Sequence, residues 1–217
     1  DMVAEKGFYG AAMSEFDDTV GALMAELDKL GVADNTIVIL TSDNAAMKFS
    51  WPDGGTTPFK QEKATTWEGG VRVPAIVRWP GVIAPDTWTT EIFAHNDWLP
   101  TLLAAAGEPG IKEKLLKGHK AGGKKYKVHL DGYDQTALLS GKGPSARKEF
   151  HYVTDNGDYA ALRYGKWKIS FLTQECNGQD VWDCSYMHHG FPLLTTLPPD
   201  HFQQITKQGI THVNVVL

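Results

Sequence analysis

The clearest candidates for chemistry are an aspartate and an asparagine that directly follow an apolar run. The run TIVIL ends at Leu40, and Asp43 and Asn44 follow it in the sequence TSDN. Carboxylate and amide oxygens are hard donors that suit Ca²⁺ or Mg²⁺ better than zinc. These cations take about six or more oxygens, so the pair predicts part of a metal site whose other ligands lie elsewhere. The alternative is structural, because Asp and Asn side chains commonly cap a turn, and the dipeptide taken alone favours this alternative.

A lysine on a glycine-rich loop is the second candidate. Lys63 is followed by ATTWEGG and then by another apolar segment. An ammonium group on such a loop can pair with an anionic oxygen of a phosphate- or sulfate-like group. Taken alone, Lys63 would be an ordinary surface lysine, and its place between two strand-like segments favours the binding role. Glu68, in the same loop, is expected to orient it.

The remaining candidates have plain structural alternatives. Trp51, in WPDGG, could stack on an aryl group in a substrate pocket or pack at the surface. His95 could face a substrate, although a structural role is the preferred interpretation, and Asp97 fits a helix-capping group better than a catalytic acid. His188 and His189 are adjacent, without the spacing of metal ligands, and are expected at the surface.

Apolar periodicity predicts the elements that must position these groups. Apolar residues recur at three- and four-residue steps over 12–31, which indicates an amphipathic helix with one stripe against a core. Residues 35–40 form a continuous apolar run, typical of a strand buried on both faces. A second strand is expected over 71–81 and a further helix over 97–106. Ligands of open α/β sheets bind at the carboxyl ends of strands, where the first two candidates fall.

The second half of the chain differs from the first in composition. Residues 111–149 are rich in lysine and glycine and are expected to form a loop or linker. Residues 150–172 contain two aromatic, β-rich runs joined by polar turns, typical of an antiparallel hairpin. The periodicity of residues 195–217 is too weak to predict an element. Cys176 and Cys184 could close a small disulfide loop or remain two buried thiols, and we expect unpaired thiols.

Composition limits the classes of function. The chain has 217 residues, of which 42% are hydrophobic, and a net charge of -5, which indicates a soluble globular protein of mixed type. The acidic balance argues against nucleic-acid binding, since the basic cluster at 112–127 is expected to be a solvated loop. No apolar run approaches the roughly 20 residues that span a bilayer, so no membrane segment is expected. The opening DMVAEKGFYGA has no signal-peptide core, and the compartment stays open.

Three stretches together resemble the second half of an arylsulfatase, from the sulfatase family of the alkaline-phosphatase-like superfamily. They are FDDTVGALMAELDKLGVADNTIVILTSDN, TTPFKQEKATTWEGGVRVPAIVRWPG and HNDWLPTLLAAAG. The resemblance is specific over about 8–108. It implies an α/β fold, part of a sulfatase-type mixed sheet flanked by helices and followed by a small antiparallel β hairpin or subdomain. The implied division is an α/β core over 1–110, a linker over 111–149, and a β subdomain with a tail over 150–217.

The resemblance also implies hydrolysis of sulfate esters with a divalent cation. Asp43 and Asn44 match ligands of the active-site cation, usually Ca²⁺, and Lys63 matches the lysine that contacts the sulfate group. Family members attack the ester with a formylglycine hydrate made from Cys or Ser in a Cys/Ser-x-Pro/Ala-x-Arg motif, which this chain lacks. The chain is therefore expected to carry half a site for a sulfate-ester small molecule and to be inactive alone.

Two departures from the family pattern bear on the site. The resemblance also implies a first Asp-Asp pair of metal ligands, which this sequence lacks. Asp17 and Asp18 are no substitute for it, because adjacent helical residues point about 100° apart. Ala45 stands where the family normally has glycine, and it would be strained if that position needs a positive φ. Two other functions remain open. The chain could be a non-catalytic fragment that self-associates through an exposed sheet edge, or a phosphoester hydrolase of the same superfamily.

Overall fold

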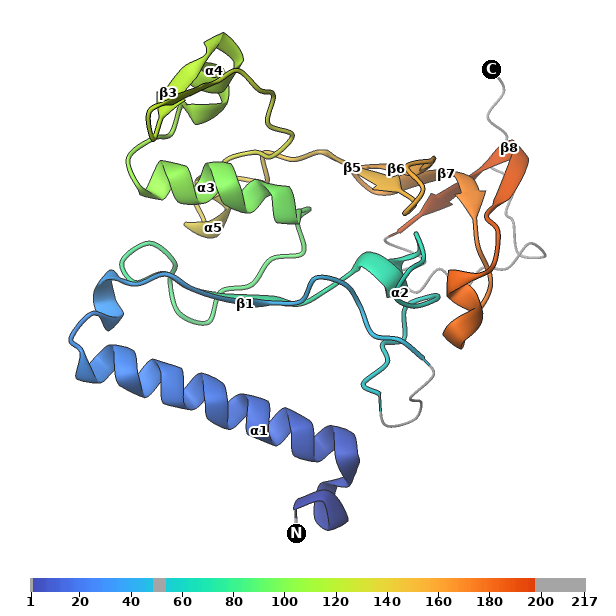
Figure 1. The fold of residues 1–217 in the computed structure, drawn as a ribbon, viewed down its shortest axis with the longest axis horizontal. Helices are drawn as coiled ribbons and strands as arrows, with labels where there is room; N and C mark the ends of the chain where they lie inside the picture. Colours follow the sequence, from blue (N-terminus) through green and yellow to red (C-terminus); the bar gives the residue numbers. More distant parts are fainter. Residues whose placement is uncertain (1, 49–53, 198–217) are drawn as a thin grey trace. The chain divides into compact units, whose positions relative to one another are not determined.

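The computed structural model describes residues 2–48 and 54–197 (Figure 1). The chain forms two compact units, one of residues 1–78 and 151–217 and the other of residues 79–150. Helices and small antiparallel sheets make up the expected α/β class. Among the described residues, no helix is both long and apolar enough to cross a membrane. The division at residues 110 and 149 stays a prediction.

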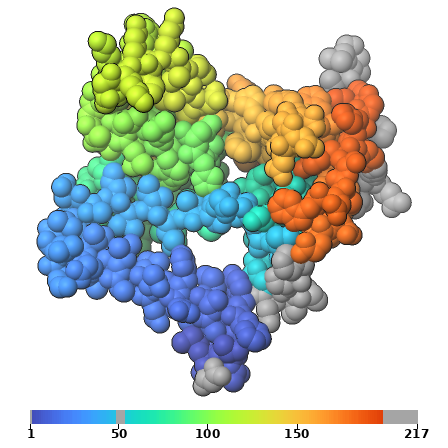
Figure 2. Space-filling view, in the orientation of Figure 1, coloured from blue at the N-terminus to red at the C-terminus, as the bar shows by residue number. Residues whose placement is uncertain are grey.

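A long N-terminal helix opens the first unit. α1 (Met2–Lys29) confirms the predicted helix and bends at Gly7, whose φ is 72°. Gly31, with φ of 69°, ends it as the sequence predicts. The expected packing of its apolar stripe is wrong: within the described residues α1 buries none of its side chains, and Phe8 is 79% exposed. Figure 2 shows dark blue atoms of α1 uncovered on the face that is drawn.

Two short strands follow and pair with each other. β1 (Val38–Thr41) runs antiparallel to β2 (Ala75–Arg78), with Val38 opposite Arg78 and Thr41 opposite Ala75. Their side chains are half-buried or exposed, so the expectation of a strand buried on both faces is wrong. A sheet of two strands has an open edge on each side, and it lacks the two helical layers that burial on both faces needs.

A four-stranded antiparallel sheet completes the first unit. Its order is β5 (Glu149–Val153), β6 (Tyr159–Tyr164), β7 (Trp167–Thr173) and β8 (Met187–Thr196). β6 and β7 form the predicted hairpin, which turns through Gly165 at φ 54°. The sequence did not predict β8, because Gly190 and Pro192 interrupt its pattern. Such a strand is tolerated at a sheet edge, and its register shifts between Ser170 and Leu172 of β7.

The second unit contains the predicted helix and several elements that the sequence did not predict. A 3-10 turn, η2 (His95–Asp97), leads into α3 (Trp98–Ala105). The expectation of a loop over 111–149 is wrong, because this region holds two helices and a hairpin. These are α4 (Ile111–Lys117), β3 (His119–Ala121), β4 (Lys124–Tyr126) and α5 (Thr136–Leu139). The signal was Gly122-Gly123, whose φ values of 55° and 79° suit a two-residue hairpin turn.

A buried ion pair organises this second unit. The Arg147 guanidinium donates to the Asp97 carboxylate, with Nη2 2.6 Å from Oδ1 and Nε 2.9 Å from Oδ2. Asp97 also accepts the backbone N–H groups of Ala94 at 3.0 Å and Tyr133 at 2.8 Å. Burial alone would raise the pKa of Asp97, and these hydrogen bonds lower it below its ordinary value. The predicted cap is therefore partly wrong, since Asp97 caps η2 through Ala94 and makes no side-chain bond within α3.

Candidate functional site

Asp43 and Asn44 lie just past the end of β1. Asp43 is exposed, and its Oδ1 accepts the backbone N–H of Asn44 at 3.0 Å. The Ser42 hydroxyl donates to the Asn44 carbonyl at 2.9 Å and closes a local turn. This turn holds a carboxylate and an amide side by side at the surface.

The loop that bears Lys63 is hydrogen-bonded to the chain immediately after this turn. The Lys63 N–H donates to the Ala46 carbonyl at 3.2 Å, and the Ala45 N–H donates to the Gly70 carbonyl at 3.1 Å. Both ends of the loop 63–70 are therefore tied to the two residues that follow Asn44. The two predicted site segments form one local structure.

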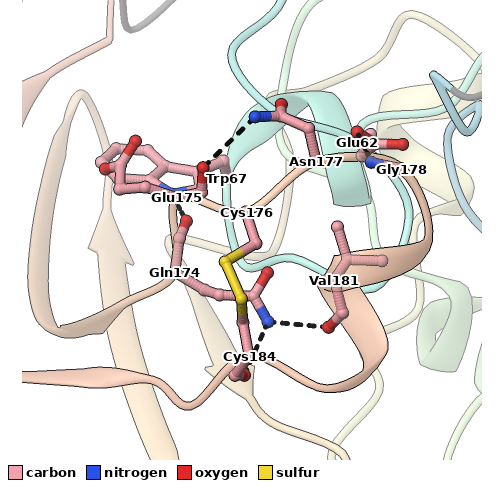
Figure 3. Close-up of a disulfide and its surroundings, with 9 residues drawn as sticks. All are labelled: Glu62, Trp67, Gln174, Glu175, Cys176, Asn177, Gly178, Val181 and Cys184. Carbon is pink, nitrogen blue, oxygen red and sulfur yellow. Dashed lines mark hydrogen bonds between the residues drawn. A yellow bond between two sulfur atoms is a disulfide. The ribbon is translucent and has the colours of Figure 1, made fainter.

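A buried carboxylate adds a third tie that sequence reasoning missed. Glu62 has 0% exposure. Its Oε2 accepts the Lys48 N–H at 2.5 Å. Its Oε1 accepts the Gly178 N–H at 2.9 Å, and Figure 3 draws Glu62 beside Gly178. Glu62 thus joins the segment after Asn44, the Lys63 loop and a distant loop near residue 178. Its only signal in the sequence was its place directly before Lys63.

The backbone around Lys63 adopts a conformation that few residues adopt freely. Gln61 and Ala64 have φ values of 64° and 68°, the left-handed region that favours glycine. Each such residue costs on the order of 1–3 kcal/mol, and the conformation persists only where the surroundings impose it. Here two backbone hydrogen bonds impose it: the Gly69 N–H donates to the Lys60 carbonyl at 2.7 Å, and the Thr65 N–H donates to the Glu62 carbonyl at 3.2 Å.

The two glycines of WEGG allow this close packing. A Cβ on Gly69 would lie 2.1 Å from the Gln61 carbonyl oxygen, and a Cβ on Gly70 would lie 2.3 Å from the Thr65 carbonyl oxygen. Both neighbours are backbone atoms, which cannot swing away as the end of a side chain can. Only glycine fits at these positions while the loop keeps its shape.

A buried lysine and glutamate anchor the loop on the sheet. Lys168 of β7 is 1% exposed, and its Nζ donates to the Thr66 carbonyl at 2.7 Å and lies 3.9 Å from Glu68 Oε1. Glu68 also accepts the Tyr152 hydroxyl at 2.9 Å, which agrees with the expected orienting role. Burial lowers the pKa of Lys168 to about 8, although Glu68 acts against this shift. Burial, followed by the charge of Glu68, raises the pKa of Tyr152 well above its ordinary value.

The two cysteines form a disulfide, so the expectation of unpaired thiols is wrong. Cys176 and Cys184 have Cα atoms 6.4 Å apart and enclose the short turn η3 (Gly178–Trp182). Gln174 fixes this loop by donating to the Val181 and Cys184 carbonyls at 2.8 and 3.2 Å (Figure 3). A spacing of eight residues is compatible with bridged and free thiols alike, so the sequence could not decide.

The concern about Ala45 is removed by the structure. The described non-glycine residues with positive φ are Gln61, Ala64 and Asp86, and Ala45 is not among them. Ala45 is buried and donates its N–H into the Lys63 loop, as described above. The turn therefore accommodates alanine without backbone strain at this position.

The other sequence candidates are distributed along the chain. His95 is exposed and belongs to the second unit, and Trp51 lies outside the described residues. Asp17 and Asp18 are exposed on α1, as expected. His188 is exposed, as expected. His189 is half-buried instead, and its Nε2 lies 2.8 Å from the hydroxyl of Thr173.

The described residues could hold part of a cation site. The Asp43 carboxylate and the Asn44 amide are the hard oxygen donors that Ca²⁺ or Mg²⁺ prefers, and they lie at an accessible turn. No group of three or more His, Cys, Asp or Glu side chains that could hold a metal occurs in the described part of the chain. The donor types therefore fit such a cation, and the remaining ligands would come from water, substrate or another segment.

Comparison with known proteins finds similarity to sulfatases. Residues 6–108 match the sulfatase family model. The chain is 35% identical over 199 residues to human (Homo sapiens) arylsulfatase A, covering 89% of this chain and 36% of the relative. It is 33% identical over 217 residues to steryl-sulfatase of Rattus norvegicus, covering 89% of this chain and 35% of the relative.

A solved structure agrees with these sequence matches. The crystal structure of a sulfatase from Pseudoalteromonas sp. superposes with a TM-score of 0.73 at 30% identity, over 91% of this chain and 38% of that protein. The chain spans about a third of the length of the curated relatives that it matches. Sequence and fold thus agree: residues 6–108 form a sulfatase family domain, and the described chain has the fold of the matching part of a sulfatase.

Proposed function

We propose that this chain supplies the cation-binding and sulfate-binding segments of a site that hydrolyses sulfate esters. In this site Asp43 and Asn44 bind Ca²⁺ or Mg²⁺, and Lys63 binds the sulfate group of a small-molecule ester. The observation that carries the proposal is the backbone pairing of the two segments, Lys63 N–H to Ala46 at 3.2 Å and Ala45 N–H to Gly70 at 3.1 Å. The match of residues 6–108 to the sulfatase family model supports the choice of ester.

The chain's own groups divide the work of binding. Asp43 and Asn44 orient a cation, which when bound would neutralise charge on the sulfate oxygens. The Lys63 ammonium adds a positive charge toward an anionic oxygen, and it does so from a loop whose shape is already fixed by Glu62 and the two glycines. A preorganised donor needs little rearrangement during the reaction, so its charge acts fully on the transition state.

Turnover needs a nucleophile that this sequence does not supply. The sequence contains no Cys/Ser-x-Pro/Ala-x-Arg motif, and its two cysteines are joined to each other. We therefore expect the 217-residue chain to bind without hydrolysing. Its rate on an aryl sulfate should equal that of the Lys63→Ala variant, and a rate far above that variant would contradict the half-site.

Calcium binding to the purified chain tests the metal ligands. In isothermal titration calorimetry we expect binding that is lost in Asp43→Ala and retained in Asp17→Ala, which removes an exposed carboxylate of α1 as a matched control. Equal binding by the chain and Asp43→Ala would contradict the assignment of Asp43. Absence of heat with the unaltered chain would mean that these two ligands alone do not form a site.

Self-association is the second candidate function. Within the described residues β1 and β2 each leave one edge open, and α1 exposes apolar side chains such as Phe16 and Leu23. Open edges and apolar stripes both favour contact with another copy of the chain. Sedimentation velocity should then show a mass that rises with concentration, and a monomer at every concentration counts against it. A phosphate ester is the remaining alternative substrate, which a panel of aryl sulfates and phosphates would distinguish once a nucleophile is supplied.

A further inference from the structure

The strongest local charge in the chain lies on α4 and the β3–β4 hairpin, which we call the basic hairpin region (residues 111–128). Seven of the chain's 21 lysines and arginines fall in this region, and its only acidic residue is Glu113. The whole chain has a net charge of -5, so this region opposes the general balance. In Figure 2 its yellow-green atoms lie at the surface of the second unit.

Most of these lysines have no acidic partner. Lys112 donates to the Gly132 carbonyl at 3.0 Å, and Lys114 pairs with Glu108. The other five form no ion pair with any described residue; they are Lys117, Lys120, Lys124, Lys125 and Lys127. All five are exposed. Their charges are therefore available to a partner.

The hairpin register brings like charges together. Lys120 lies directly opposite Lys125, so both side chains project from the same face. The stem of Lys125 also lies over Gly118 at the end of α4, because a Cβ built on Gly118 would be 2.7 Å from Lys125 Cε. This contact brings the hairpin charge close to the last turn of α4, which carries Lys117. Like charges directly opposite on a hairpin are unfavourable, and a bound anion would relieve their repulsion.

We propose that the basic hairpin region binds an extended sulfated polysaccharide. Several unpartnered ammonium groups on two adjoining elements match a polymer that carries repeated negative charges, rather than a single small anion. On the other face of the hairpin, exposed Tyr126 lies opposite His119 and offers a ring against which a sugar can pack. The choice of sulfate over phosphate rests on the proposed function, in which the chain binds the sulfate group of an ester.

Binding of dextran sulfate by the 217-residue chain tests this surface, with uncharged dextran of equal length as the comparison. We expect binding that weakens steeply with salt and no binding of dextran. Lys120→Gln combined with Lys124→Gln should weaken binding at least about tenfold and lower the slope of log affinity against log salt by about 1.5. Lys142→Gln combined with Lys166→Gln, two exposed lysines outside the region, is the matched control and should stay within about twofold, because these lysines would lie outside the contact that releases counterions.

Three results would overturn the proposal. These are an equal loss in the control pair, equal binding of uncharged dextran, or equally tight binding of single-stranded DNA at the same salt concentration. The hairpin variant should unfold at the same temperature as the unaltered chain or slightly higher, so a loss of binding cannot come from misfolding. None of these measurements requires turnover, so their failure is distinct from failure of the calcium and hydrolysis experiments.

Discussion

Glu62 shows how one side chain can hold a site that it does not enter. Its two carboxylate oxygens accept N–H groups from Lys48 and Gly178, and its own carbonyl accepts the Thr65 N–H. A carboxylate binds such donors with charge-assisted hydrogen bonds, which are stronger than neutral ones. The loop that carries Lys63, the next residue, is therefore held by three segments of the chain. Glu62 is a positioning residue, because it acts through the Lys63 loop.

Replacing Glu62 should loosen this loop before it affects any other part of the chain. Glu62→Ala leaves the half-buried N–H groups of Lys48 and Gly178 without this acceptor, and we expect a loss of about 1–3 kcal/mol in the free energy of unfolding. Glu62→Gln keeps the shape but turns one acceptor into a donor that faces an N–H, so its loss should be smaller. Urea unfolding measures both losses, and hydrogen exchange should show faster exchange at the Lys48 and Gly178 amides.

The matched control is Glu175→Gln, at an exposed carboxylate that pairs with Lys60 at 3.0 Å. A surface pair of this kind contributes about 0–1 kcal/mol, so the control should change little. If Glu62→Gln were as stable as this control, with unchanged amide exchange, the positioning role would be wrong.

At the scale of elements, glycines decide where the chain can approach itself. Gly69 and Gly70 lie in α2 (Glu68–Val71), and both are buried against the backbone of residues 60–65. Gly21 is different, because it lies in α1 and a Cβ there would meet no atom within 4 Å. The same residue type is thus required in one helix and merely tolerated in another.

Alanine at these glycines should change stability with opposite signs. Gly70→Ala forces a Cβ to 2.3 Å from the Thr65 carbonyl oxygen, and we expect a loss of about 2–3 kcal/mol. Gly21→Ala should instead gain about 0.5–1 kcal/mol, because alanine costs less backbone entropy in a helix. Thermal unfolding of both variants measures the difference. A Gly70→Ala protein as stable as the unaltered chain would mean that the loop has another conformation of similar energy.

Local pattern predicted the elements whose periodicity is strong and failed where contacts decide. Such patterns involve residues that are close together in the sequence. They are the three- and four-residue spacing of α1, the apolar run of β1 and the aromatic alternation of β6 and β7. β8 was missed because a strand broken by Gly190 and Pro192 forms only by pairing with β7. The β3–β4 hairpin could have been found from its Gly-Gly turn.

At the scale of the whole molecule, sequence reasoning found the chemical groups and missed what holds them. Asp43, Asn44 and Lys63 were named from residue type and spacing, which local sequence contains. The structure that holds these residues depends on hydrogen bonds between residues far apart in the sequence. Glu62 accepts from Gly178 at a separation of 116 residues, and Lys168 donates to Thr66 at a separation of 102. No periodicity in the sequence reports such pairs, so the burial of a glutamate and a lysine could not be predicted.

Buried charge also makes the stability of the molecule depend on pH in the acidic range. The pKa of Asp97 is lowered in the folded chain, because its hydrogen bonds to Arg147 and others outweigh burial. A carboxyl whose folded pKa is lowered stabilises the fold above its ordinary pKa of 3.8, and this contribution is lost as the pH falls through the folded value. The ion pair of the second unit is therefore expected to weaken in acid.

Lys168 should produce the opposite trend at alkaline pH, and a Lys168→Met variant isolates it. Burial lowers the folded pKa to about 8 from 10.5, so between these values the unfolded chain holds a proton that the folded chain has released. Stability then rises with pH, and we expect the unaltered chain to gain about 2 kcal/mol over the variant between pH 8 and 10.

The upper limit of that window is set by Tyr152. Its pKa is raised in the folded chain, so above pH 10 the unfolded tyrosine loses its proton first and stability falls in the unaltered chain and the variant alike. Urea unfolding at pH 8, 9 and 10 measures the difference between the two proteins below this limit. A difference that stays constant over the window would mean that Lys168 keeps its proton inside the fold, held by Glu68 and the Thr66 carbonyl. The lysine would then act as the charged half of a buried pair that anchors the Lys63 loop to β7.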